Sequence, residues 1–253
     1  MCLIVVGWKI QPDTPLVVAA NRDEFYARPT AAAGPWADAP GVIAGRDLEA
    51  GGTWLGITEA GRFAAVTNVR EPGAPPGRIT RGRLTRDFLC SGVAPEDYLR
   101  AIAGTDYAGF NLLVGDRESL HYLSNRADAP RRLAPGLYGV SNHLLDTPWP
   151  KLTTARERFT QALASLPDRE ALFALLADDE IVADAQLPDT GVSLAWERLL
   201  SAIFVRSENY GTRASTVLIR TATGEITLEE RSFGPLGQAL GRVVQSSRIS
   251  TGV

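Results

Sequence analysis

The residues of this chain that could do chemistry begin with Cys2, which follows Met1 directly. Because Cys has a small side chain, removal of Met1 is expected, and it would expose the α-amino group of Cys2. An N-terminal nucleophile can use its own α-amine as general base, since the ordinary pKa values of the amine (about 7.7 to 8.0) and the thiol (about 8.5) nearly match. A Cys that begins an apolar strand is more often a small buried residue. The position of Cys2 directly after Met1 favours a role as nucleophile over that of a buried core residue.

Polar side chains end three apolar runs and form a second group of candidates. The tetrapeptide NRDE at 21–24 ends the run 15–20, while Asn68 and Asn142 end two later runs. Each has a plain interpretation as a turn or capping residue. The run 15–20 is expected to pair with the strand that carries Cys2, so the tetrapeptide is the group most closely tied to the nucleophile.

Metal sites and disulfides are disfavoured by the small number of suitable side chains. The chain has two cysteines and two histidines, too few for a disulfide framework or a Cys/His zinc site. Metal catalysis would have to rest on carboxylates, and we expect neither a metal nor another cofactor. His121 lies in an apolar strand and is interpreted as a core or edge residue, whereas His143, beside Asn142, could face a pocket.

Composition excludes several functional classes. The 253 residues are 45% apolar and carry a net charge of −3, which disfavours disorder and nucleic-acid binding. Arg78, Arg81 and Arg83 are interpreted as a solvated face. No apolar run approaches the ~18 to 20 residues of a spanning helix, and the N-terminus lacks a secretory signal. We expect a cytoplasmic protein without membrane insertion and leave homo-oligomers open.

Hydrophobic periodicity predicts the elements that must position these residues. Apolar runs separated by turn residues predict strands at 2–6, 15–20, 53–58, 62–68, 110–114, 119–123, 137–140, 216–220 and 225–229. Helical spacing predicts helices at 81–91, 95–103, 194–204 and within 149–178 on either side of 166–168. The Ala, Gly and Pro-rich stretch 30–52 is expected to be a long loop, and the tail from Gly237 is rich in Gly and Ser.

The order of these elements predicts the fold class. Strands arrive as hairpins and helices arrive in blocks, which favours an α+β protein with large antiparallel sheets over the βαβ alternation of a parallel sheet. No repeat or linker divides the chain. We therefore predict a single domain over residues 1–253.

Several blocks along the chain carry a family resemblance. They occur in order from the first residue to about residue 231: Met1-Cys2, AANRDEFYARP (19–29), GGTWLGI (51–57), AAVTN (64–68), RGRL (81–84), GFNLL (109–113), YGVSNHLLDTPWPK (138–151) and YGTRASTV (210–217). In this arrangement the chain resembles the NRDE family, also called the transport and Golgi organization 2 family. The family itself is poorly defined biochemically.

A more distant resemblance supplies a possible chemistry. The order of Cys2, an Arg and Asp pair, and two later Asn residues is similar to choloylglycine-hydrolase-like N-terminal nucleophile hydrolases. That resemblance implies a four-layer αββα sandwich in which Cys cleaves a linear amide bond. It implies these roles: Cys2 as nucleophile and base, Arg22 and Asp23 around its thiol and amine, Asn68 and Asn142 as oxyanion or amine partners, and Arg213 as a further residue of the site. Asn21, beside Arg22, and His143, beside Asn142, are further candidates for the binding site.

One departure from that pattern concerns Arg22 and Asp23. The superfamily pattern separates Arg from Asp by two residues, whereas here they are adjacent and would point to opposite faces of an extended strand. Either a bulge brings them together, or only one of them, with Asn21, reaches Cys2. The charge of Arg22 is expected to favour the ionised form of Cys2, so a larger fraction of Cys2 than of Cys90 should be thiolate at neutral pH.

Two functions remain open at this point. The first is an N-terminal cysteine hydrolase acting on an amide bond of an unidentified small molecule. The alternative, implied by the NRDE family, is a non-catalytic carrier of a hydrophobic ligand such as haem, with His143, His121 or Cys2 as axial ligand.

Overall fold

The computed structural model describes residues 2–249 and contains two antiparallel sheets. Sheet A has the strand order β10-β1-β2-β11-β12-β13, and sheet B has the order β3 to β9. The strands of sheet A are β1 (Cys2–Trp8), β2 (Leu16–Phe25), β10 (Gly136–Val140), β11 (Tyr210–Arg220), β12 (Glu225–Phe233) and β13 (Ala239–Arg248). The strands of sheet B are β3 (Thr30–Pro35), β4 (Val42–Asp47), β5 (Leu55–Thr58), β6 (Phe63–Asn68), β7 (Phe110–Gly115), β8 (Leu120–Ser124) and β9 (Arg131–Leu133).

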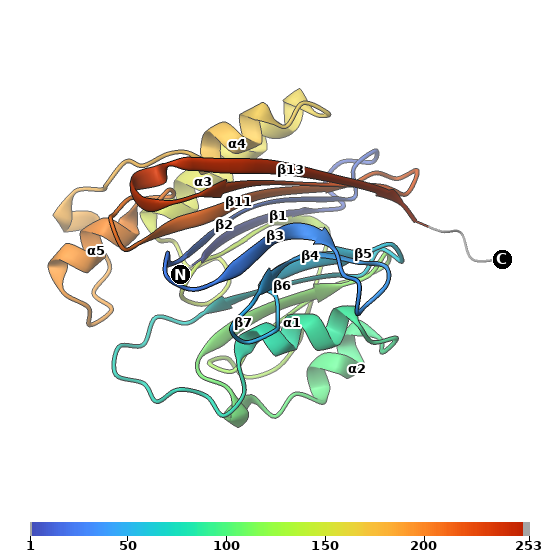
Figure 1. The fold of residues 1–253 in the computed structure, drawn as a ribbon, viewed down its shortest axis with the longest axis horizontal. Helices are drawn as coiled ribbons and strands as arrows, with labels where there is room; N and C mark the ends of the chain where they lie inside the picture. The colour runs from blue at the N-terminus through green and yellow to red at the C-terminus, as the bar shows by residue number, and fades with distance from the viewer. Residues whose placement is uncertain (1, 250–253) are drawn as a thin grey trace.

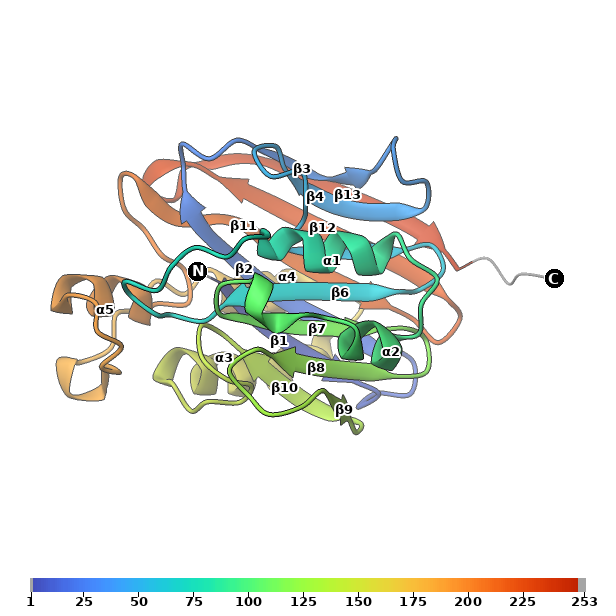
Figure 2. The ribbon, with the colours of Figure 1, turned by 90° about the horizontal axis from the view of Figure 1, so that it is seen from below.

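Helices cover the outer face of each sheet, which gives four layers (Figures 1 and 2). The helices are α1 (Arg81–Leu89), α2 (Pro95–Arg100), α3 (Pro150–Ala162), α4 (Glu170–Leu176) and α5 (Leu194–Ser201). Helices α3 and α4 lie on sheet A, and α1 and α2 lie on sheet B. The predicted α+β fold, a four-layer αββα sandwich with two antiparallel sheets, is confirmed. Within residues 2–249, no helix is both long and apolar enough to cross a bilayer.

Side chains alternate in direction along β1 and β2, so this one hairpin contributes to two hydrophobic cores. Successive strand residues point to opposite faces. Ile4 and Val18 therefore enter the core between the sheets, whereas Leu3 and Val17 pack under α3 and α4. Near-continuous apolar runs are what a strand buried on both faces requires. This hairpin brings the start of β1 and the end of β2 to the same edge of the layers.

Two segments differ from the sequence-based expectation. The stretch 30–52, expected to be a loop, contains β3 and β4, and part of the tail after Gly237 forms β13 on β12. Both β3 and β13 are edge strands. Edge strands tolerate Gly and Pro because one side of their backbone needs no partner strand, so alternation there is weak. The pairing of β3 with β4 is irregular between Ala31 and Gly34.

Glu229 joins three elements on the outer face of sheet A. Its side chain is 1% exposed. The carboxylate oxygens accept hydrogen bonds from Arg169 Nε at 2.8 Å, Arg231 Nη2 at 3.2 Å and Arg242 Nε at 2.7 Å. Although burial alone raises the pKa of this carboxyl, the hydrogen bonds from the three guanidiniums outweigh that effect and lower the pKa to about 2. The carboxylate thus holds the start of α4 and strand β13 to β12.

We expect Glu229→Gln to lower the free energy of unfolding at pH 7 by about 2 to 3 kcal/mol, since a lowered carboxyl pKa is a stability contribution. This contribution is present above the ordinary Glu pKa and is lost as the pH falls through the folded-state pKa of about 2. Urea unfolding of both proteins between pH 7 and pH 3 measures it. A difference that does not shrink with falling pH would contradict this account.

Candidate active site

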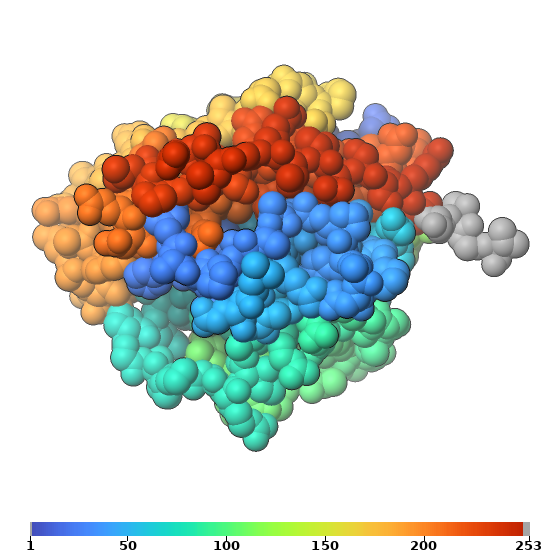
Figure 3. Space-filling view, in the orientation of Figure 1, coloured from blue at the N-terminus to red at the C-terminus, as the bar shows by residue number. Residues whose placement is uncertain are grey.

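A cavity of about 650 Å³ lies between two parts of the fold. On one side are the start of β1 and the end of β2 in sheet A, and on the other are the end of β6 and the start of α1. Its walls combine apolar side chains, among them Trp54, Val66 and Ile79, with many charged ones. Figure 3 shows the segment that contains β3 and β4, in blue, lying between the red C-terminal strands and the green region of α1. Residues of β3 and β4 line the cavity, so this segment closes one side of it. Such a volume is typical of a small-molecule site.

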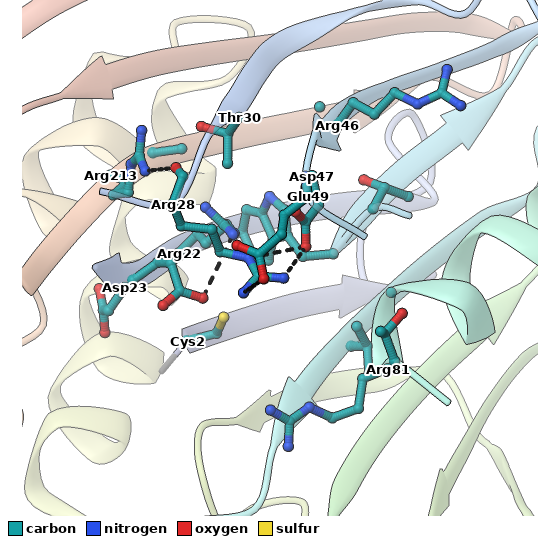
Figure 4. Close-up of a pocket in the computed structure, with 18 of the residues that line it drawn as sticks. Cys2, Arg22, Asp23, Arg28, Thr30, Arg46, Asp47, Glu49, Arg81 and Arg213 are labelled. Atoms are coloured by element: carbon teal, nitrogen blue, oxygen red, sulfur yellow. Dashed lines mark hydrogen bonds and ion pairs between the residues drawn. The ribbon is translucent and has the colours of Figure 1, made fainter. Parts of the chain in front are cut away.

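Cys2 borders this cavity as the first residue of β1 (Figure 4). Its Cα is paired with that of Arg22 across the β1–β2 ladder, so both side chains are on the inner face of sheet A. Burial raises the pKa of the Cys2 thiol, and the Arg22 charge offsets only part of that effect. This burial outweighs the effect expected from Arg22, whose charge does not by itself leave Cys2 as a thiolate. A neutral thiol needs a base. Met1, whose removal is expected, lies outside the described residues.

A chain of hydrogen bonds connects Cys2 to the two predicted asparagines. Ser141 Oγ donates to the Cys2 carbonyl at 3.0 Å and lies 3.2 Å from Asn142 Oδ1. Asn142 Nδ2 donates to Asn68 Oδ1 at 2.8 Å. Asn68 lines the cavity, whereas Asn142 is completely buried behind it. The structure thus brings both asparagines to Cys2, with Asn68 in front and Asn142 supporting it.

The NRDE tetrapeptide lies within β2 and alternates between the two faces of sheet A. Arg22 and Glu24 point to the cavity, with Arg22 Nη2 3.7 Å from Glu24 Oε2. Asn21 points away: its Nδ2 donates at 2.8 Å to the carbonyls of both Leu176 and Ile203, and its Oδ1 accepts a hydrogen bond from Ser215 Oγ. Asn21 is fully buried, and this corrects its assignment to the binding site. Its amide instead fixes the end of α4 and the segment after α5 to sheet A.

Asp23 follows Arg22, the ladder partner of Cys2, so its side chain lies on the opposite face of β2 from that of Arg22. The strand β2 has no bulge there; the irregularity is opposite, in β11 between Thr212 and Ala214. Thr212 Oγ1 donates to Asp23 Oδ1 at 2.7 Å. Burial raises the pKa of Asp23, and the nearby Lys151 ammonium opposes that shift. Arg22 and Asp23 thus lie on different faces of sheet A, with Arg22 on the face of the Cys2 thiol.

Lys151 is a buried cation that sequence reasoning missed. It follows Pro150 at the start of α3, and its Nζ donates to the Leu200 carbonyl at 2.9 Å. Burial lowers the pKa of Lys151 to about 8, and the Asp23 carboxylate counteracts part of this change. The only sequence signal was its place at the end of the block YGVSNHLLDTPWPK.

Arg213 and His143 occupy different surroundings. Arg213 is the extra residue of the β11 irregularity and lines the cavity. Its Nη1 donates to the carbonyls of Phe25 and Tyr26 at 3.2 Å and to that of Arg28, which closes the turn after β2. His143 is exposed, and its Nδ1 is 2.9 Å from Thr147 Oγ1. It does not line the cavity, so its assignment to the site is corrected: the chain turns outward immediately after Asn142.

Several charged residues of the cavity were missed, among them Arg81 and Glu230. Arg81, interpreted from the sequence as part of a solvated face, extends from the start of α1 into the cavity (Figure 4). Glu230 is 4% exposed; its Oε1 accepts a hydrogen bond from the Ala33 backbone N–H at 2.8 Å, and burial raises its pKa. The sequence analysis selected polar residues that directly follow apolar runs. Neither Arg81 nor Glu230 has that position.

Close backbone contact places the start of α1 at the cavity. A Cβ on Gly52 would come within 2.5 Å of the Gly82 carbonyl carbon, and Thr53 N–H donates to the Gly82 carbonyl at 3.2 Å. A side chain at position 52 would push α1 away, because backbone atoms cannot rotate aside as a side chain can. The GGTW and RGRL blocks are therefore two halves of one contact.

The described residues offer little for a metal or a haem. Within residues 2–249, no group of three or more His, Cys, Asp or Glu side chains is placed to hold a metal ion. His121 is buried in β8 with its Cα paired to that of Arg132, and like His143 it does not line the cavity. Cys2 is thus the one of the three suggested axial ligands that borders it.

Comparisons with known proteins agree with the family resemblance. The model of the family described as transport and Golgi organisation 2 matches residues 1–235. Homologs of transport and Golgi organization protein 2 from Bos taurus and Homo sapiens are 39% and 37% identical to the chain, and each alignment covers 92% of this chain and 93% of the relative.

Two solved structures were also found. An N-acylethanolamine-hydrolyzing acid amidase ortholog of Caenorhabditis elegans has a TM-score of 0.49 and 13% identity, covering 86% of this chain and 92% of its own. A mutant conjugated bile acid hydrolase from Clostridium perfringens has a TM-score of 0.46 and 9% identity, covering 99% of this chain and 97% of its own.

Proposed function

The chain belongs to the transport and Golgi organisation 2 family, and we propose that it is a hydrolase that uses Cys2 to cleave a linear amide bond of a small molecule. One observation carries this proposal. Cys2 begins strand β1 at the wall of a cavity of about 650 Å³, with Arg22 paired to it across the β1–β2 ladder and Asp23 next to Arg22 in β2. This arrangement supports a nucleophile whose base is its own α-amine.

The first half of the reaction acylates Cys2. Once Met1 has been removed, the α-amine takes the thiol proton and Sγ attacks the amide carbonyl, forming a carbon–sulfur bond and an oxyanion. The carbon–nitrogen bond then breaks, and the α-ammonium gives its proton to the departing amine. A thioester on Cys2 remains.

The second half releases the acid. Water, with its proton taken by the α-amine, attacks the thioester carbonyl through a second oxyanion. The carbon–sulfur bond breaks, and the proton returns from the α-ammonium to Sγ. No metal or organic cofactor enters this sequence of bonds, and the net reaction consumes one water for each amide cleaved.

The residues around Cys2 have separate tasks in this proposal. The Arg22 guanidinium stabilises the thiolate formed when the proton leaves. Asp23 orients the α-ammonium and stabilises its charge. Asn68 donates to the oxyanion from the cavity wall, and Asn142 holds Asn68 in place through the hydrogen bond to its Oδ1.

An acyl-trapping experiment tests the proposal. We expect incubation of the processed protein with activated acyl esters of several chain lengths to add one acyl mass, which peptide mapping places on Cys2. Cys2→Ala should take up no acyl group, and hydroxylamine should remove the adduct because it is a thioester.

Cys90 provides the matched control for this experiment. It is the chain's other free thiol and is exposed, so Cys90→Ala should leave acylation unchanged. Equal labelling of the two cysteines would mean that Cys2 is not activated. Absence of any adduct on Cys2, together with tight uptake of haemin that survives Cys2→Ala, would instead support a carrier.

A further inference from the structure

Building on the proposed hydrolase function, we propose that the substrate is an amide that carries a carboxylate, and that Arg81 binds this carboxylate. The cavity wall holds the guanidinium of Arg81 on a different element from all the residues assigned to catalysis. Figure 4 shows Arg81 entering from α1, on the side of Cys2 away from Arg22 and Arg28. A group bound there would lie next to the thiol without covering Arg22.

Arg81 differs from the other arginines of the cavity in its partners. Arg28 Nη2 is 2.7 Å from Asp47 Oδ2, and Arg46 Nη1 is 2.6 Å from an oxygen of Asp38. Arg22 pairs with Glu24, and Arg213 donates to three carbonyls. Among the residues described by the structure, Arg81 makes no ion pair, and its one hydrogen bond runs from Nη1 to the Gly109 carbonyl at 3.1 Å.

The hydrogen-bonding capacity of Arg81 indicates what it lacks. A guanidinium has five N–H donors, and one of the five on Arg81 is accounted for within residues 2–249. The bond to Gly109 fixes the end that carries Nη1, so the Nη2 and Nε edge remains for a partner. A carboxylate matches such an edge with two parallel hydrogen bonds.

The other charges of the cavity favour a ligand with one negative charge over a ligand with two. The wall also carries the carboxylates of Glu24, Asp47, Glu49 and Glu230. Several of these are paired with arginines, yet together they would repel a phosphate dianion much more than a monoanion. A compact carboxylate beside one uncompensated guanidinium is therefore favoured, as in an N-acyl amino acid.

Binding to an inactive protein tests the inference without hydrolysis. We expect Cys2→Ala to bind N-acylglycines with acyl chains of 2 to 12 carbons, measured by calorimetry, and to bind their uncharged methyl esters at least 10-fold more weakly. Arg81→Met in that background should weaken binding of the acids about 10- to 100-fold and change ester binding little. Arg81→Lys, which keeps the charge but not the planar fork, should lose less.

Arg83 offers the matched control on the same helix. It is 53% exposed, lies outside the cavity lining and pairs with Asp87, so Arg83→Met should leave both affinities unchanged. Equal affinity for acids and esters, equal losses for both in Arg81→Met, or failure of every acylglycine to bind would each overturn the carboxylate site.

Kinetics separate this inference from the function on which it rests. With intact Cys2, N-octanoylglycine should have a higher kcat/KM than uncharged N-octanoylpropylamine, and Arg81→Met should remove that preference mainly by raising KM. Acylation of Cys2 without any preference for the acid would leave the hydrolase standing and overturn the carboxylate site. Selective binding of the acids without acylation of Cys2 would do the reverse.

Discussion

A form of the protein that retains a residue in front of Cys2 should lose amide hydrolysis by about 10⁴-fold, because its thiol has no base. Removal of one member of a nucleophile and base pair commonly has an effect of this size. Burial raises the pKa of Cys2, so the thiol does not ionise unaided near neutral pH. A bulky residue inserted after Met1 would create this form, and its rate is measured beside that of protein shown by intact mass to begin at Cys2.

A cleavable N-terminal tag supplies the control. The tagged protein should be folded and inactive, and proteolysis that leaves Cys2 first should restore the full rate in the same sample. Acetylation of the Cys2 amine should abolish activity again while Sγ remains free. If a form with Met1 retained or with an acetylated amine hydrolyses amides at the normal rate, the α-amine is not the base.

Asn68→Ala should lower kcat by about 10² to 10³-fold with a smaller change in KM. A preorganised donor acts where charge develops in the transition state, and its loss costs about 3 to 4 kcal/mol. Asn68 is at the end of β6, lines the cavity and is held by Asn142. Steady-state kinetics on the most rapidly cleaved amide, with thermal unfolding as a check of the fold, measures the effect.

Asn142→Ala should also lower kcat, though through Asn68. Its Nδ2 donates to Asn68 and its carbonyl accepts the Arg70 N–H at 2.8 Å, so the side chain supports a residue of the cavity instead of touching substrate. The double variant should therefore be no slower than Asn68→Ala alone, because the two changes remove one function. Fully additive losses would show that Asn142 contacts the oxyanion itself.

Sequence patterns sufficed for the parts of the fold in which local signals agree. The first hairpin combines two apolar runs with a turn rich in Pro, and its register brings Cys2 opposite Arg22. The later hairpins and the main helices follow from the same periodicities. Alternation also predicted that Arg22 and Asp23 would face different sides, and the structure shows that β2 runs through both without a bulge.

The remaining parts depend on contacts between distant segments. Asn21 has the same polar type as Asn68, yet its partners are the Leu176 and Ile203 carbonyls, more than 150 residues away in sequence. In the sequence, Arg81 looks the same as the solvated Arg83. The contact between Gly52 and Gly82 places the start of α1, and with it Arg81, at the cavity. Strand β3 has too little alternation to be recognised without its partner β4. In each case the deciding information lies in a neighbour that local sequence does not reveal.

The alternation of β2 also has a consequence for how this protein can change. Arg22 and Glu24 line the cavity, whereas Asn21 holds the outer layer to sheet A. Variation at Glu24 can therefore alter selectivity while the scaffold and the pairing of Arg22 with Cys2 persist, but variation at Asn21 leaves two buried carbonyls without donors. A deletion of one residue in β2 would exchange the two sets at once. The strand thus alternates, with a period of two residues, between a face that lines the cavity and a face that holds the scaffold.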